Sequence, residues 1–194
     1  MNTTSLSLLD RLKNAKQDAT AWQSLQEIYL PLIRSWLSCL GSLRGEVDDL
    51  AQEVLVVVLR ELPAFERRRD GAFRAWLRQI TVNRVRSFCK ARQRQPRAGL
   101  GHEEEQLLAQ LADPASDLAR QWDREHDRHV LQKLLAMVRP DFEPTTWQAF
   151  IRFALEGLPA TRVAQELGIS ESAVVQAKFR ILKRLREETE ELLE

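Results

Sequence analysis

The stretch LPATRVAQELGISESAVVQAKFRILKRLR, residues 158–186, predicts two helices joined by a tight turn. A first helix is expected from about Thr161 to Leu167, because its apolar residues recur with the spacing of one helix face. Gly168 gives the backbone the freedom that a turn after a helix requires. Ser170 can cap the second helix through its hydroxyl, and Val174 should face the first helix. This spacing is typical of a helix-turn-helix.

The second helix of this pair is basic. From Ser172 to Arg186 it carries five positive side chains and no negative one. A basic helix after a short turn is the form that enters a DNA major groove, although a solvated amphipathic helix that aids solubility has the same pattern. If Ser170 caps the helix, its predicted DNA-facing residues are Ser170, Glu171, Ser172, Val175, Gln176, Lys178, Phe179, Arg180, Lys183 and Arg184. Among these, Gln176 suits adenine, Arg180 suits guanine and Val175 suits a thymine methyl group.

Charge is strongly segregated along the 194 residues, although the net charge is only +1. Residues 60–97 contain twelve basic and three acidic side chains, whereas residues 98–127 contain two basic and eight acidic ones. Two basic segments separated by an acidic connector indicate two nucleic-acid contacts on one chain.

Composition excludes several classes of protein. Charged residues make up 29% and hydrophobic residues 44%, an ordinary balance for a soluble chain, and no apolar run reaches the length of a membrane span. Cys39 and Cys89 lie in apolar helical patterns, so we expect two buried free thiols in a reducing cytosol. His126 and His129 lack a third metal ligand nearby. We therefore expect no metal, no cofactor and, without a catalytic set, no enzyme.

An acidic segment opens the next candidate helix. Glu46, Asp48, Asp49 and Glu53 precede or flank a wide apolar face that runs from Leu50 to Leu62 at helical spacing. Acids in a first turn also favour a helix through its dipole alone. Their role as a binding surface is therefore one of two interpretations.

Aromatic and basic residues alternate further along the chain. The loop FERRRDG, residues 65–71, is followed by a helical pattern that continues to Phe88. Aromatic rings interleaved with arginines are a means of gripping unstacked single-stranded bases. The competing interpretation is that Phe73 and Trp76 are simply part of the core.

The chain as a whole is predicted to be all-α, because no segment shows the alternating period of a strand. We expect a first helical domain over residues 1–95 and an acidic linker over 96–115, with one short helical turn from Glu103 to Leu111. A second helical domain is expected over residues 116–194. In it, Ser116 should cap a long helix that reaches Val138.

Three motifs give the chain a family resemblance. EVDDLAQEVL (Glu46–Leu55), FRAWLRQITVN (Phe73–Asn83) and EGLPATRVAQELGISESAVVQAKFRIL (Glu156–Leu182) are similar to motifs of bacterial sigma factors. The chain resembles the small extracytoplasmic-function type, which keeps only the second and fourth conserved regions. Arg162, Ala173 and Val175 depart from the usual third motif, so the resemblance does not carry over the identity of the bases that are read.

The resemblance implies binding to core RNA polymerase, promoter recognition and duplex opening in the cytoplasm, at the nucleoid. It implies contacts with the beta-prime clamp helices and the beta flap of the polymerase, and allows an anti-sigma factor. The implied clamp-helix contacts are Glu46, Asp48, Asp49, Gln52 and Glu53. The implied minus-ten and melting residues are Phe65, Arg67, Arg68, Arg69, Phe73, Trp76, Asn83 and Arg84. The helix from Ser172 would read the minus-thirty-five element.

Two rival functions remain at this point. A helix-turn-helix regulator that acts without polymerase explains residues 158–186, but it gives no reason for the motifs at Glu46–Leu55 and Phe73–Asn83. A helical adaptor that binds only proteins is disfavoured by the two basic segments. Co-purification with core polymerase and salt-dependent DNA binding separate these alternatives.

Overall fold

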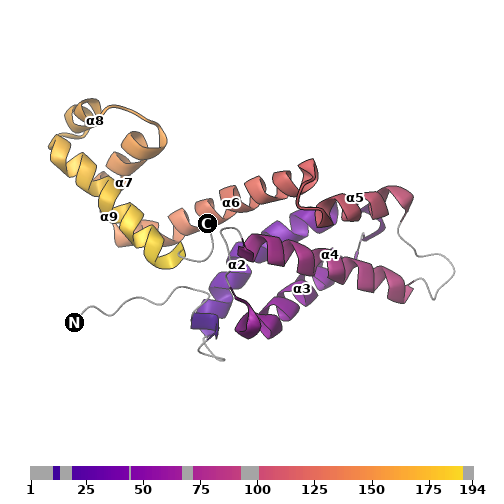
Figure 1. The fold of residues 1–194 in the computed structure, drawn as a ribbon. Helices are drawn as coiled ribbons and strands as arrows, with labels where there is room; N and C mark the ends of the chain where they lie inside the picture. Colours follow the sequence, from indigo (N-terminus) through magenta and orange to yellow (C-terminus); the bar gives the residue numbers. More distant parts are fainter. Residues whose placement is uncertain (1–10, 14–18, 44, 67–71, 93–100, 190–194) are drawn as a thin grey trace. The chain divides into compact units, whose positions relative to one another are not determined.

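The computed structural model describes residues 11–13, 19–43, 45–66, 72–92 and 101–189. Every regular element in these ranges is a helix, which confirms the predicted all-α class (Figure 1). The chain divides into two compact units, one built mainly from residues 8–130 and the other mainly from residues 131–190. We call them the N-terminal unit and the C-terminal unit. None of the described helices is long and apolar enough to span a membrane.

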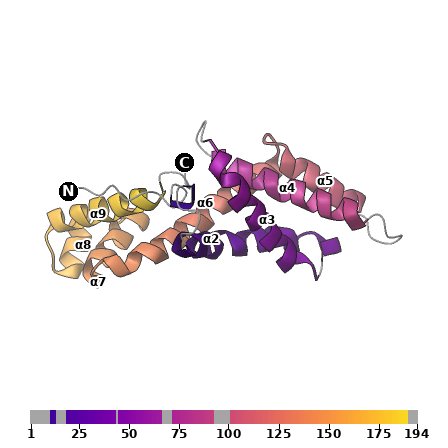
Figure 2. The same ribbon diagram turned by 90° about the horizontal axis from the view of Figure 1, so that it is seen from below.

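Three helices form the centre of the N-terminal unit. They are α2 (Ala19–Ser38), α3 (Val47–Glu61) and α4 (Ala72–Arg92), with α3 packed against both of the others (Figure 2). The short helices η1 (Gly41–Leu43) and η2 (Leu62–Ala64) connect them. Pro31 lies inside α2 without ending it. The core is mainly apolar, with Leu25, Ile28, Ile33, Leu50, Leu55 and Leu62 fully buried.

Residues 101–112 differ from the predicted linker. They form α5 (His102–Ala112), an eleven-residue helix packed against α4, rather than one short turn. Glu104 explains the difference, since its carboxylate accepts hydrogen bonds from the backbone N–H groups of Gly101, at 3.2 Å, and Ser42, at 2.8 Å. These bonds close the start of the helix and tie it to η1. Leu108 and Leu111 are buried beneath it.

The long helix α6 (Asp117–Val138) begins where the sequence predicts. Ser116 Oγ accepts a hydrogen bond from the Ala119 N–H at 3.0 Å, which is the capping geometry expected for a serine. Trp122 is fully buried, with its ring centroid 4.8 Å from that of Trp36 in α2. The first part of α6 therefore packs within the N-terminal unit, and the division between the units falls inside this helix rather than before Ser116. The boundaries predicted for the two functional domains stay predictions.

The C-terminal unit contains η3 (Arg139–Asp141), α7 (Pro144–Phe150), the π-helical turn η4 (Ile151–Leu155), α8 (Ala160–Leu167) and α9 (Glu171–Thr189). Its small core brings together Ala149, Val163, Ala164, Val174 and Ala177. Gly168 adopts φ +66°, the left-handed conformation that ends α8. Ser170 Oγ accepts a hydrogen bond from the Ala173 N–H at 3.2 Å. The predicted turn, cap and inward-facing Val174 are confirmed.

One prediction about the cysteines is wrong. Cys89 is buried, but Cys39 is exposed. Cys39 follows the end of α2, and its thiol donates a hydrogen bond to the Ser35 carbonyl at 3.5 Å. Its side chain is exposed although Leu40 and Leu43, just after it, are buried.

Candidate functional site

An open groove of about 500 Å³ lies along the outer surface of α3 and α4. Asp49, Gln52 and Glu53 of α3 line it, as does Arg84 of α4. The first three belong to the predicted polymerase-contacting set, and Arg84 belongs to the predicted minus-ten set. The structure thus brings members of both sets to one surface.

An ion pair connects the two sets across this groove. Arg84 Nη2 lies 2.6 Å from Glu53 Oε2, and its Nε donates to the same oxygen at 2.8 Å. The side chains are 38% and 47% exposed, so solvent screens the pair and its contribution to stability is modest. The pair places both charged groups side by side at the surface.

The remaining predicted acids also contact arginines. Asp48 lies 2.7 Å from Arg34 Nε of α2, and Glu46 lies 3.8 Å from Arg92 Nη1 of α4. Both acids keep exposed surface on their side chains. The acidic start of α3 is therefore joined by ion pairs to α2 and α4, while its carboxylates stay accessible to solvent.

Sequence reasoning missed the apolar part of this surface. Val56 is 59% exposed and lies in the groove, and Leu59 is 39% exposed on the same helix. Both fall outside the buried stripe of α3 although both are apolar. That mismatch between residue type and helix face was the signal available in the sequence. Acids beside exposed aliphatic side chains form a surface suited to a protein partner.

An aromatic cluster occupies the start of α4. The Phe65 ring centroid lies 4.8 Å from that of Trp76 and 5.7 Å from that of Phe73, and Phe73 also contacts Tyr29 at 5.5 Å. Phe73 is only 3% exposed, so in this structure it belongs to the core. Phe65 and Trp76 are half-buried, and the Lys13 ammonium lies 5.5 Å from the Phe65 ring centroid. Arg67, Arg68 and Arg69 lie outside the described residues.

Asn83 is exposed on α4, one residue before Arg84. Its side-chain oxygen accepts a hydrogen bond from Gln79 Nε2 at 2.9 Å. The bond joins residues one helical turn apart and orients the amide of Asn83. The NH₂ group of that amide can donate to another acceptor. A base edge offers such acceptors.

Two other arginines of α4 form ion pairs with α6 instead of pointing into solvent. Arg78, only 4% exposed, pairs with Asp123 of α6 at 2.5 Å and donates to the Ala119 carbonyl at 3.3 Å. Arg74 Nη1 lies 2.8 Å from Asp127 Oδ2. The basic segment and the acidic segment of the sequence thus meet directly, within the N-terminal unit.

A buried histidine completes this contact. His126 is fully buried, with its ring centroid 5.7 Å from that of Tyr29 and Nδ1 3.0 Å from Asp127 Oδ1. Burial lowers the pKa of His126, and although Asp127 opposes the change, burial prevails. Next along the helix, His129 Nε2 lies 2.6 Å from the Ile28 carbonyl. Within the described residues, no three His, Cys, Asp or Glu side chains are placed to hold a metal ion.

The outer face of α9 carries most of the second predicted DNA-binding set. All ten of its members except the half-buried Arg184 are exposed. Arg184 Nε donates to Asp141 at 2.9 Å, Arg180 reaches Thr146 at 3.5 Å, and the Lys178 ammonium lies 5.4 Å from the Phe153 ring centroid. These three basic residues are thus held against the rest of the C-terminal unit.

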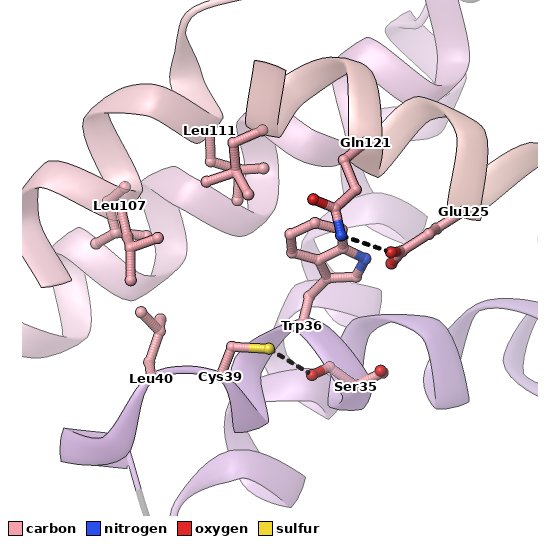
Figure 3. Close-up of a pocket in the computed structure, with 10 residues that line it drawn as sticks. Ser35, Trp36, Cys39, Leu40, Leu107, Leu111, Gln121 and Glu125 are labelled. Atoms are coloured by element: carbon pink, nitrogen blue, oxygen red, sulfur yellow. Dashed lines mark hydrogen bonds between the residues drawn. The ribbon is translucent and has the colours of Figure 1, made fainter. Parts of the chain in front are cut away.

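A separate pocket of about 380 Å³ lies between α2, α5 and α6 in the N-terminal unit (Figure 3). Trp36, Cys39, Leu107 and Leu111 line it, with Gln121 bonded to Glu125 at its polar side. None of the predicted functional residues lines this pocket. The surfaces of α3, α4 and α9 therefore remain the candidate functional site.

Comparison with known families supports the N-terminal assignment. Residues 25–95 match the family described as Sigma-70 region 2. This range includes α3, α4 and most of α2, and so contains the groove, the aromatic cluster and Asn83. No curated protein matches the chain.

Proposed function

We propose, from the premise that residues 25–95 are a Sigma-70 region 2 domain, that the chain is a promoter-specific sigma factor of the extracytoplasmic-function type. The domain itself indicates a sigma factor's role in polymerase binding and promoter melting, which requires no catalytic chemistry. The motifs EVDDLAQEVL and FRAWLRQITVN support the finer subtype. The observation that carries the proposal is the single surface of α3 and α4 on which Glu53 and Arg84 meet.

Polymerase binding is assigned to the α3 side of that surface. Asp49, Gln52 and Glu53 supply polar and charged contacts, and the exposed Val56 supplies apolar contact area. Such a mixture of an apolar patch with a polar rim is typical of transient protein interfaces. We assign it to the beta-prime clamp helices of core polymerase, with Glu46 and Asp48 at its edge.

Promoter melting and minus-ten recognition are assigned to the α4 side. Half-buried Phe65 and Trp76 have aromatic faces on which an unpaired base can stack, and the Asn83 amide can hydrogen-bond to a base edge. Arg84 supplies positive charge next to Asn83. Phe73 packs behind Phe65 and Trp76, and it is itself buried against Tyr29.

Minus-thirty-five recognition is assigned to α8 and α9, acting as a helix-turn-helix. The left-handed Gly168, the Ser170 cap and the inward Val174 give the pair its turn and its crossing. The N-terminal residues of α9 are exposed, as base-reading residues must be. Contact of this unit with the beta flap, a place at the nucleoid and control by an anti-sigma factor belong to the same proposal.

The test begins with binding to core polymerase. The chain should co-purify with core polymerase and convert it to a form that initiates at defined promoters. A regulator that acts alone would bind duplex DNA but would not bind core polymerase. That second result would refute the proposal.

A further inference from the structure

Two large apolar side chains stand on the outer face of α9. Phe179 is 72% exposed and Val175 is 48% exposed, whereas Val174, Ala177, Ile181 and Leu185 of the same helix are buried. Val175 and Phe179 are four residues apart, so they lie on the same side of the helix, about 6 Å apart along its axis. The core of the C-terminal unit therefore does not use them, and they form an apolar pair facing solvent.

The surroundings of this pair are positively charged. From Ser172 to Arg186 the helix has no acidic residue, and the exposed Gln176, Lys183 and Arg186 lie along the same stretch. This acid-free basic stretch of α9 is complementary to a polyanion rather than to an ordinary protein surface. Duplex DNA offers one apolar group on its base edges, the C5-methyl group of thymine in the major groove. The basic charge of α9 and the apolar pair on its surface therefore both fit a thymine methyl group in duplex DNA.

We propose that Val175 and Phe179 form a thymine-selecting pair, which makes the upstream element prefer thymine at two positions within about two base pairs of each other. The distance of one helical turn between the side chains compares with a rise of about 3.4 Å per base pair. This inference rests on the proposed minus-thirty-five role of α9, and it adds which bases are preferred. Lys183 and Arg186 would serve the phosphates on either side.

Replacement of thymine by deoxyuridine tests the pair, because it removes the methyl group and nothing else. The preferred upstream duplex is first selected from random sequences with the full chain, and each thymine in it is then replaced singly. At the contacted positions the parent chain should bind about fourfold more weakly, the effect of one methyl group, which corresponds to about 0.8 kcal/mol. Phe179→Ala and Val175→Ala should each abolish the weakening by deoxyuridine at one of the two contacted positions.

Matched variants separate the inference from the proposed function. Lys183→Ala should weaken thymine and deoxyuridine duplexes equally, and Phe179→Leu should keep part of the methyl penalty. If the parent chain selects no duplex sequence at all, the proposed minus-thirty-five role fails together with the inference. If it selects a sequence but shows no deoxyuridine penalty, or if Phe179→Ala and Val175→Ala both keep the full penalty, only the thymine-selecting pair is refuted.

Discussion

Arg84 of α4 and Glu53 of α3 share an ion pair in which Arg84 Nη2 lies 2.6 Å from Glu53 Oε2. One side of this pair belongs to the surface assigned to polymerase, and the other belongs to the surface assigned to promoter DNA. A partner that withdraws Glu53 from the pair changes the charge presented beside Asn83. The two surfaces to which these activities are assigned are thus adjacent in space.

The first prediction concerns core polymerase. Asp49→Arg combined with Glu53→Arg should weaken binding while helicity is retained, because both side chains line the exposed groove. A pull-down titration measures the affinity. Adding Arg84→Glu to this variant gives a charge-swap control, since it restores an ion pair between positions 53 and 84 without restoring the acid at position 53. If the swap regains full affinity, the loss came from the broken pair and the contact assignment is wrong.

The second prediction concerns duplex opening. Asn83→Ala, and truncation of Arg67, Arg68 and Arg69, should impair transcription from a duplex promoter more than from a template already mismatched at the bubble. Gln79→Ala is the matched control for Asn83, because it removes the hydrogen bond at 2.9 Å but keeps the asparagine amide. Permanganate footprinting measures the opening. An equal loss on both templates would argue for a folding defect instead.

The third prediction concerns the contact between α4 and α6. Asp123→Ala should lower the free energy of unfolding of the N-terminal unit by about 2–3 kcal/mol, because it leaves the guanidinium of Arg78 buried without its carboxylate. The figure is below that for a fully buried pair because Asp123 is 31% exposed. Asp117→Ala, in the exposed pair with Arg120, should change stability by less than about 0.5 kcal/mol. Urea unfolding of both variants tests this difference.

The fourth prediction concerns pH. The pKa of buried His126 lies below its ordinary value of 6.5, so as pH falls the unfolded chain takes up this proton before the folded chain does. Its contribution to stability should be complete above about pH 6.5 and should decline as pH falls from there toward the folded-state pKa. The pH range depends on the charged groups near the His126 ring. Asp127 and Asp123 raise the pKa of His126, and Arg74 lowers it.

Urea midpoints at pH 7.5 and pH 5.5 measure this effect. His126→Gln should reduce the loss between the two pH values, whereas His102→Gln, at an exposed position on α5, should leave it unchanged. Equal pH dependence in the parent chain and His126→Gln would show that another group is responsible.

The fifth prediction divides the residues of α9 into two classes. Gln176→Ala should change which upstream sequence is preferred, at a cost of about 1–3 kcal/mol at one base pair. Lys183→Ala should weaken all sequences alike and lower the salt slope by about one unit. Selection on randomised upstream DNA distinguishes the classes. If Gln176→Ala keeps the parental sequence preference, the reading face has been placed wrongly.

Local signals were sufficient for much of the fold. Ser116 and Ser170 were predicted as helix caps, and both accept the expected backbone hydrogen bonds. Gly168 was predicted to end a helix, and it has the left-handed conformation. Caps and turns depend on a few neighbouring residues, so a single sequence carries them.

Long-range pairing was not visible in the same way. Arg74 and Arg78 counted toward a basic surface, yet they contact acids on α6 roughly 45 to 53 residues away. Arg184, in the predicted DNA-facing set, is held by Asp141. The length of α5 likewise depended on the contact of Glu104 with Ser42. Charge and periodicity do not show which distant side chain a residue meets.

Run-off transcription with purified core polymerase on genomic fragments tests the central claim most directly. The account predicts discrete start sites that appear only when this chain is added, and that disappear with Asp49→Arg combined with Glu53→Arg. If the chain binds duplex DNA selectively but produces no start site with core polymerase, it is a regulator that acts alone, and the sigma-factor account is contradicted.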